Sequence, residues 1–249
     1  VDDPLIFVLE QEASPSLKEK SIRLLLDRKC QKAIPALIAL LKDDSVTLRE
    51  LSARSLGKLQ ANEAEKSLLS VINRKSESED VIAEALLSLG KMTKVSAKSK
   101  KVLQAHLDHL NSKVRGYSIS ALGQIGDVSM VDPLIERLMD PNQDNRPLMI
   151  QALANLGDSR AVEPLLTIVQ EAKRNSISGL KGAYLGSYAV QALAKLGEPK
   201  VIDLLLTDWE EELEQGIQQM GSTAVPYLEK ALNNRDSRVR QLAAEGLGL

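Results

Sequence analysis

The feature that most constrains the fold is an internal repeat with a period of about 32 residues. In its clearest copies, Leu56, Leu89 and Leu122 each have a small residue four positions earlier and a glycine directly after. The equivalent positions run along the whole chain: Leu25, Leu56, Leu89, Leu122, Leu153, Leu193, Ile217 and Leu247. Because stacked repeats contact only their neighbours, this pattern predicts a solenoid.

Each repeat contains two helical segments. One type has proline near its start and leucines at helical spacing, as in 33–41, 131–138, 161–166 and 224–228. Turn residues such as Asp43, Asp44 and Ser45 follow it, and the leucine-anchored segment comes next. We therefore expect helix A, a short turn, helix B and a glycine-containing turn in each repeat. No stretch shows sustained strand alternation, so the prediction is an all-α fold.

Composition agrees with a thin, layered core. Hydrophobic residues make up 43% of the chain but aromatic residues only 2%, so the core is built from Leu, Ile, Val and Ala. The formal net charge of −2 gives no overall field that favours nucleic acid or an anionic membrane, and no apolar run is long enough to span a bilayer. Cys30 stands alone, which argues against disulfides and favours a cytoplasmic location.

The repeat motif resembles a known family. Its B segment, seen in Val114–Asp127, is a Val-Arg pair followed by Ala-Leu-Gly and Gly-Asp, and it resembles the HEAT repeat. In particular it is similar to the short bacterial type named after phycobilisome lyases. The resemblance implies a right-handed α-solenoid, armadillo/HEAT-like, of about eight two-helix repeats. We expect one such solenoid over residues 1–249, and we expect the chain to be a segment of a longer protein because it ends within a motif.

Counting helix B from its first apolar residue as position zero separates core from surface. Positions 4, 7, 8 and 11 fall on the side of position zero, whereas positions 6 and 10 point outward. The resemblance implies that helix B lines the concave wall, with position 3 at its edge. We predict that a partner binds there, at Arg54, Lys58, Lys91, Tyr117, Gln151, Tyr188 and Gln191, with a merely solvated face as the alternative. Cationic, amide and aromatic groups together suit a protein or peptide with some acidic character.

Position 1 of helix B carries a recurring cation. It is Lys18, Arg49, Arg115, Arg146 or Arg240, and Asp44, Asn111, Asn142 or Asp236 lies four or five residues before the arginines. A buried guanidinium needs paired acceptors, and in HEAT proteins such residues form a ladder between repeats. We predict a structural role for these arginines, with ligand binding as the alternative.

Two irregularities interrupt the repeat. About eight extra residues fall within 171–182, a basic segment that we expect to form a lengthened loop between helices, either as a binding loop or as a tolerated insertion. The next repeat is contracted, and Trp209 is expected to fill a packing gap beside its short helix. His106 and His109 share a helical spacing, but no third ligand of suitable type accompanies them except Asp108, so no metal site is predicted.

The sequence favours a protein-interaction scaffold over an enzyme. The deoxyhypusine hydroxylase type of HEAT-like fold needs several His-Glu pairs for iron, and this chain has none. A DNA-glycosylase type needs tryptophans in a basic cleft, whereas the one Trp lies in an acidic stretch. We predict no catalytic residue and no cofactor. The alternative is a phycobilin lyase subunit or a related chromophore-handling protein, because the repeats of that type resemble the repeats of this chain.

Overall fold

The computed structural model describes residues 3–139, 144–175, 180–207 and 212–249, and the regular elements among them are all helical. No strand occurs in these ranges, which confirms the all-α prediction. The helices pair as eight A–B units and group into two compact parts, Val1–Asp127 and Val128–Leu249. We describe each part by itself, and a single solenoid over 1–249 stays a prediction.

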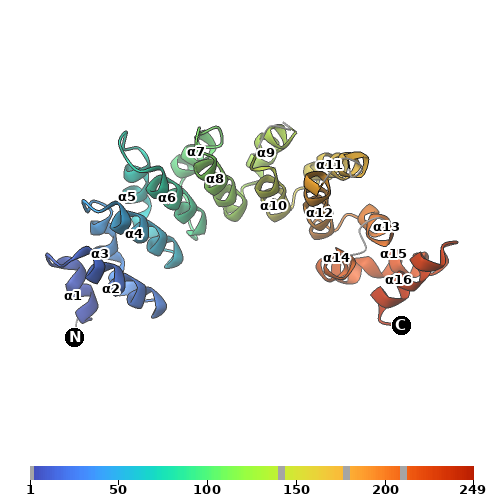
Figure 1. Ribbon diagram of the computed structural model, residues 1–249, viewed down its shortest axis with the longest axis horizontal. Helices are drawn as coiled ribbons and strands as arrows, with labels where there is room; N and C mark the ends of the chain where they lie inside the picture. The colour runs from blue at the N-terminus through green and yellow to red at the C-terminus, as the bar shows by residue number, and fades with distance from the viewer. Residues whose placement is uncertain (1–2, 140–143, 176–179, 208–211) are drawn as a thin grey trace. The chain divides into compact units, whose positions relative to one another are not determined.

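The part Val1–Asp127 has two layers of helices (Figure 1). Each A helix packs on the B helix that follows it, and neighbouring B helices pack on one another. The A helices are α1 (Pro4–Glu10), α3 (Ile34–Leu40), α5 (Glu65–Ile72) and α7 (Ala97–Ala105). The B helices are α2 (Pro15–Asp27), α4 (Val46–Lys58), α6 (Glu79–Lys91) and α8 (Ser112–Ile125).

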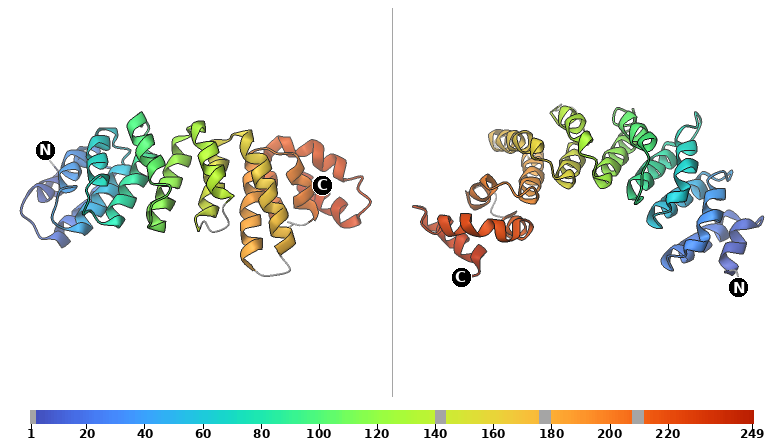
Figure 2. Two further views of the ribbon diagram at one scale, coloured as in Figure 1. Left: turned by 90° about the horizontal axis from the view of Figure 1, so that it is seen from above. Right: turned by 180° about the vertical axis from the view of Figure 1, so that it is seen from behind.

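The part Val128–Leu249 repeats this arrangement (Figures 1 and 2). Its A helices are α9 (Val131–Leu138), α11 (Val162–Asn175), α13 (Lys200–Thr207) and α15 (Val225–Ala231). Its B helices are α10 (Arg146–Leu156), α12 (Leu180–Lys195), α14 (Leu213–Met220) and α16 (Ser237–Leu247). Short 3-10 turns precede most A helices after α1: η1 (Gln31–Ala33), η2 (Asn62–Ala64), η3 (Val128–Met130), η4 (Ser159–Ala161) and η6 (Gly221–Ala224).

The turn after helix B usually has a left-handed residue four positions after the anchor leucine of the repeat, although Thr93 after α6 is an exception. Gly126, Gly157 and Gly197 occupy that position with φ of 74°, 69° and 72°. Glycine adopts this conformation without steric cost, which explains its place in the motif. In the first two repeats Lys29 and Gln60 adopt it instead, with φ of 49° and 54°.

Small residues let the B helices approach closely, as the sequence predicted. A Cβ added to Gly90 would lie 2.4 Å from the Ala121 Cα atom of α8, and one at Gly57 would lie 2.8 Å from the Ser88 Cα atom of α6. The buried Ser88 hydroxyl also donates to the Ala53 carbonyl at 2.7 Å, which ties α6 to α4. Glycine and serine therefore set the spacing of the layer.

The recurring arginines have a structural role, but the predicted ladder is wrong in its partners. Arg49 donates to the carbonyls of Asp43 and Asp44 at 2.8 and 2.9 Å, and Arg115 and Arg240 bind the equivalent carbonyls of their own turns. The side chains of Asn111 and Asp236 instead cap the first turns of α8 and α16. Short polar side chains satisfy helix N-termini well, which explains the recurrence of Asp and Asn. Asn142 lies outside the described residues.

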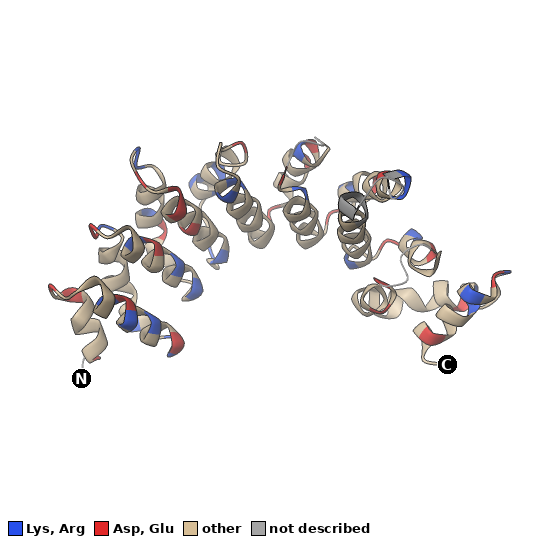
Figure 3. Cartoon of the chain, in the orientation of Figure 1, with Lys and Arg blue, Asp and Glu red and all other residues tan. Residues whose placement is uncertain are grey.

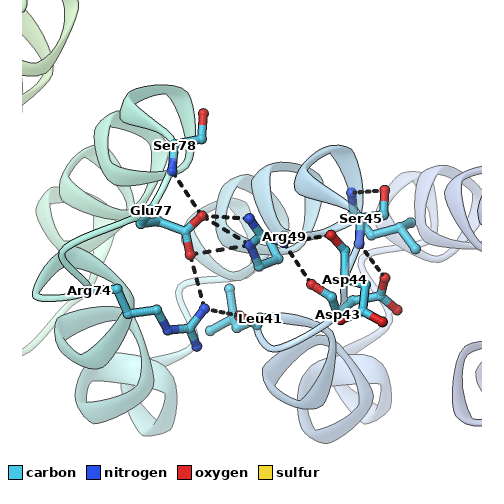
Figure 4. Close-up of polar contacts among 9 residues, drawn as sticks. Leu41, Asp43, Asp44, Ser45, Arg49, Arg74, Glu77 and Ser78 are labelled. Atoms are coloured by element: carbon cyan, nitrogen blue, oxygen red, sulfur yellow. Dashed lines mark hydrogen bonds and ion pairs between the residues drawn. The ribbon is translucent and has the colours of Figure 1, made fainter.

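The acidic partner of the cation at position 1 belongs to the next repeat. Glu77, with its side chain 1% exposed, accepts from Arg49 at 2.8 to 3.2 Å and from Arg74 at 3.0 Å (Figure 4). Arg74 in turn donates to the Leu41 carbonyl at 3.0 Å. Lys18 and Asp43 pair in the same way at 3.4 Å. These contacts clamp consecutive inter-helix turns together.

The insertion at 171–182 lengthens helices rather than a loop. Residues up to Asn175 belong to α11 and residues from Leu180 belong to α12, so these helices have 14 and 16 residues. The predicted loop is therefore wrong for the described part of this segment, while residues 176–179 lie outside it. The contraction that follows is confirmed for helix B, because α14 has 8 residues whereas the other B helices have 11 to 16. Trp209 lies outside the described residues.

Candidate partner-binding surface

We call the surface formed by positions 6 and 10 of the B helices the B-helix face. In the part Val1–Asp127 its central cation is Arg54 on α4. The Arg54 guanidinium donates to Glu50 at 2.7 Å and to Glu84 of α6 at 2.8 Å. Glu84, expected at the edge of the wall, is buried, with 3% of its surface exposed. Hydrogen bonding to Glu84 raises the pKa of Arg54 above its usual value even though burial opposes its charge. Arg54 therefore stabilises the contact between α4 and α6.

Tyr117 on α8 lies beside this network. The Lys113 ammonium group sits 5.7 Å from the Tyr117 ring centroid and also pairs with Asp80 of α6 at 2.5 Å. Hydrogen bonding to Asp80 raises the pKa of Lys113. The half-buried Tyr117 ring therefore lies beside an ion pair. This pair occupies part of the space in which a ligand could contact the ring.

Lys58 and Lys91 differ from Arg54. They lie in the last turns of α4 and α6, where the helix dipole favours a cation, and Figure 3 shows the positive charge at these helix ends. Among the described residues neither ammonium group forms an ion pair. Of the four predicted site residues in this part, these two are the ones available to an acidic partner.

In the part Val128–Leu249 the structure brings the other three predicted residues into one pocket. Gln151, Tyr188 and Gln191 line a cleft of about 190 Å³ between α10, α12 and α14. The cleft has an apolar floor of Ile150, Ala154 and Ala192, and further polar groups come from Asn155, Lys195, Gln215 and Gln219. Lys195 donates a hydrogen bond to Asn155 across its edge. We call this cleft the amide pocket.

The sequence interpretation missed Gln215 and Gln219. Counting back from Ile217 places them at positions 6 and 10 of α14, the same rows as Gln151 and Asn155 on α10 and as Gln191 and Lys195 on α12. The amide pocket is therefore built from two outward rows on three successive B helices. The α14 segment matches the repeat motif poorly, and for this reason the sequence did not indicate its outward residues.

Several side-chain carboxamides in this pocket have no hydrogen-bond partner among the described residues. Within the described ranges, the side chains of Gln151, Gln215 and Gln219 form no hydrogen bond, and all three are exposed. Gln191 makes one long contact, 3.5 Å to the Ser187 hydroxyl. Each carboxamide can donate two hydrogen bonds and accept two, so the pocket offers neutral polar groups of both kinds.

A tyrosine pair borders the amide pocket. The Tyr184 and Tyr188 rings meet edge to face with centroids 5.0 Å apart, and their hydroxyl groups are 2.9 Å apart. This hydrogen bond, with a contribution from burial, raises the pKa of Tyr188 above its usual value of 10.0. The pair holds the Tyr188 ring in place, while Tyr184 remains 63% exposed.

The histidines form local contacts. The rings of His106 and His109 stack with centroids 5.8 Å apart, and His106 Nδ1 lies 2.7 Å from the Val102 carbonyl. His109 Nδ1 accepts a hydrogen bond from the backbone N–H of Asn111 at 3.1 Å. Among the described residues, no three His, Cys, Asp or Glu side chains cluster as metal ligands would. None of the described helices is long and apolar enough to cross a membrane.

Comparison with known proteins agrees with this geometry. A family model described as HEAT repeats matches residues 3–90 and 99–178. The chain belongs to the HEAT-repeat family. No curated protein matches it. This HEAT-repeat chain is similar to the Escherichia coli protein YibA, with a TM-score of 0.61, 20% identity, and coverage of 100% of this chain and 92% of that one.

A second similar structure is the complex of CpcE and CpcF of phycocyanin lyase from Nostoc sp. PCC7120. The TM-score is 0.57 at 20% identity, and the match covers 97% of this chain and 92% of that one. At such identity the likeness shows the fold alone. The HEAT-type helical-repeat fold predicted from the sequence is therefore confirmed.

Proposed function

We propose that this HEAT-repeat chain is an interaction scaffold that binds an extended segment of a partner protein at the amide pocket. The observation that carries the proposal is the set of carboxamides on three successive B helices: Gln151, Gln215 and Gln219 form no hydrogen bond among the described residues, and Gln191 makes one long contact. They lie beside the buried apolar side chains of Ile150, Ala154 and Ala192, so the pocket offers a partner apolar contact together with exposed hydrogen-bond donors and acceptors.

Main-chain recognition suits this arrangement. An extended peptide presents alternating N–H and C=O groups and rises about 3.3 Å per residue. Packed helices lie about 8–10 Å apart, so carboxamides on successive B helices would meet a peptide every third residue or so. A carboxamide can bind either kind of main-chain group, which makes the contact tolerant of peptide sequence. Tyr188 adds a rigid contact of large area.

In the other part of the chain, Lys58 and Lys91 support the same function by charge. Their unpaired ammonium groups on α4 and α6 suit an acidic region of a partner. Arg54 and Tyr117, also predicted as contacts, stay in the proposal as secondary contacts, because Arg54 already pairs with Glu50 and Glu84 and Tyr117 lies beside the paired Lys113.

Site-specific photocrosslinking tests the proposal. A benzophenone amino acid is placed at Gln219, in the amide pocket, and at the exposed Glu136 of α9 as a matched control. We expect protein cross-links in the native cell from position 219 that are absent from position 136, and mass spectrometry would identify the partner. Cross-links from position 136 alone would contradict the proposed surface.

The competing contact is the basic segment 173–181. Its central residues, 176–179, lie outside the described residues. Deleting these four residues is compared with a Tyr117→Ala/Tyr188→Ala double variant once a partner is identified. Normal binding by the folded double variant, together with loss of binding in the deletion, would transfer the contact to this segment.

The alternative function is handling of a phycobilin. The likeness to the CpcE–CpcF complex is the observation that favours it, and that likeness extends to the fold only. Incubating the chain with a phycobilin tests it directly. A visible absorbance shift, or transfer of the chromophore to an apo-phycobiliprotein, would replace the scaffold proposal, whereas an unchanged spectrum would remove the alternative.

A further inference from the structure

A second cleft lies next to the amide pocket in the part Val128–Leu249. It has a volume of about 410 Å³ and lies between α14 and α16. Leu213, Ile217 and Leu242 give it an apolar interior, and the exposed carboxylates of Glu214 and Glu245 stand at its mouth. We call it the acid-rimmed cleft. It combines a hydrocarbon-lined interior with negative charge at the solvent boundary.

The two clefts flank one exposed edge of α14. At about 100° per residue, Gln215 and Gln219 fall on one flank of the helix and Ile217 on the other. Leu213, Gly216 and Met220 point into the core, while Glu214 and Gln218 face solvent between the flanks. A chain bound in the amide pocket can therefore cross this edge and reach the acid-rimmed cleft.

Gly246 keeps the interior of this cleft narrow. A Cβ at Gly246 would lie 2.6 Å from the Ile217 Cδ1 atom, so glycine permits the close approach of α16 to α14. Gln241 donates to the Glu245 carboxylate at 2.9 Å and orients it. The interior is thus formed by packed hydrocarbon, and Glu245 at the rim has a defined position.

We infer that the acid-rimmed cleft binds a lysine or arginine side chain of the same partner segment. The inference rests on the proposed function, because the amide pocket places the main chain of that segment. A long basic side chain lays its methylene groups along apolar surface and keeps its charged end in water, which matches an apolar interior below two carboxylates. Arginine can also bind a carboxylate with two parallel hydrogen bonds.

The geometry also sets a spacing in the partner. An α-helix with its side chains is about 10 Å across, and an extended chain covers that distance in about three residues. The basic side chain should therefore occur about three residues beyond the stretch held by the amide pocket. This requirement separates the inference from a general attraction between a basic peptide and an acidic surface.

A peptide-display selection tests the inference. A library of random dodecapeptides is selected against the immobilised full chain, and against three variants of it. The first is Glu214→Lys/Glu245→Lys in the cleft. The second, with the same change of charge, is Glu136→Lys/Glu229→Lys on exposed positions of α9 and α15. The third is Gln151→Ala/Gln215→Ala/Gln219→Ala in the amide pocket. Fluorescence polarisation of the enriched peptides gives their dissociation constants.

We expect the unaltered chain and the α9/α15 variant to enrich peptides with Lys or Arg at one fixed position. The cleft variant should bind those peptides at least about tenfold more weakly and lose the basic preference. Peptides that bind the unaltered chain with no basic preference, and bind the cleft variant equally well, would overturn the inference and leave the proposed function intact. No enrichment, or enrichment unaffected by the amide variant, would overturn both.

A second copy of this chain is the other occupant to be tested. Sedimentation velocity at increasing concentration measures self-association of the unaltered chain and of the cleft variant. We expect both to sediment alike. Self-association that disappears in Glu214→Lys/Glu245→Lys would assign the acid-rimmed cleft to a contact between copies and overturn the peptide assignment.

Discussion

The two parts of the chain use the same repeat positions differently. Position 6 is Arg54 in α4, where the guanidinium joins Glu50 and the buried Glu84. Position 6 is Gln151 in α10, where the carboxamide has no hydrogen-bond partner among the described residues. Position 6 therefore strengthens the contact between repeats at α4 in Val1–Asp127, whereas at α10 in Val128–Leu249 it remains available for binding. Helical geometry therefore gives the location of an outward side chain. Whether that side chain stabilises the fold or is available for binding depends on its hydrogen-bond and ion-pair partners.

The largest expected effect concerns the clamp at Glu77. Glu77→Ala leaves the Arg49 guanidinium, which is 14% exposed, without its carboxylate partner. Breaking a buried pair by removing one partner typically costs about 3–5 kcal/mol, so we expect a loss of about 3 kcal/mol in the free energy of unfolding. Urea denaturation of the Glu77→Ala variant and of a Glu63→Ala control, at an exposed carboxylate without a partner among the described residues, measures it. Equal stability of the two variants would show that the clamp is not structural.

The second effect tests the role of position 6 directly. Arg54→Ala leaves Glu84 buried and uncompensated, and because Arg54 is itself 38% exposed we expect a loss of about 2 kcal/mol. An Arg54→Met/Glu84→Leu double variant should recover most of this loss, since a hydrophobic pair of similar volume can replace a buried ion pair. If Arg54→Ala retained full stability and lost partner binding, Arg54 would belong to the binding surface.

A smaller loss is expected at the arginine that binds the turn carbonyls. Arg115→Ala removes hydrogen bonds of 2.7 and 2.9 Å to His109 and Leu110. When buried carbonyl groups lose a charged hydrogen-bond donor, the free energy of unfolding falls by about 1–3 kcal/mol. These carbonyls are partly exposed, so we expect a loss near the lower limit. Thermal denaturation beside an Arg115→Lys variant measures it. An unchanged melting temperature with lost partner binding would make the role functional.

The stability contributed by the Glu77 clamp in the part Val1–Asp127 should depend on pH. Burial alone would raise the pKa of Glu77, but hydrogen bonds from Arg49 and the Ser78 amide outweigh it and hold the pKa below its ordinary 4.5. Folding therefore favours the ionised form, and that stabilisation is complete above pH 4.5 and lost as the pH falls through the lower folded-state value.

Melting temperatures of the unaltered chain and of Glu77→Gln check this at several pH values. The unaltered chain should be the more stable at neutral pH by a constant margin. The margin should narrow below pH 4.5, where the unaltered chain takes up a proton at Glu77 and the glutamine does not. A margin that widened on acidification would contradict the assignment.

The smallest effect on stability is expected in the amide pocket. Gln151→Ala removes a side chain without a partner, so the free energy of unfolding should change by no more than about 0.5 kcal/mol. Binding of a selected peptide should weaken, because the carboxamide would be lost from the recognition row. Fluorescence polarisation and urea denaturation of this variant, set beside Arg54→Ala, compare the two parts at the same repeat position. A large loss of stability in Gln151→Ala would remove the difference between them.

The sequence by itself determined the fold class and the layer architecture. The anchor leucines, the small residues at Gly57 and Gly90, and the left-handed glycine after helix B are local requirements of helix packing and chain reversal, so they are visible as a period. The outward rows and their edge also followed from helical geometry, which predicted Gln151, Tyr188 and Gln191 as residues of one surface, and the structure places them in one pocket.

Only the tertiary structure decided which outward groups pair with one another. Whether Arg54 is free or bound depends on Glu84 of the next repeat, and the carboxylate that Arg49 needs comes from Glu77, 28 residues later. The described residues of the inserted segment, 171–175 and 180–182, are helical because α11 and α12 pack on each other, although the Ser and Gly content indicated a loop. Pairings between repeats depend on side-chain geometry across a packed interface, and a period along one chain does not contain that information.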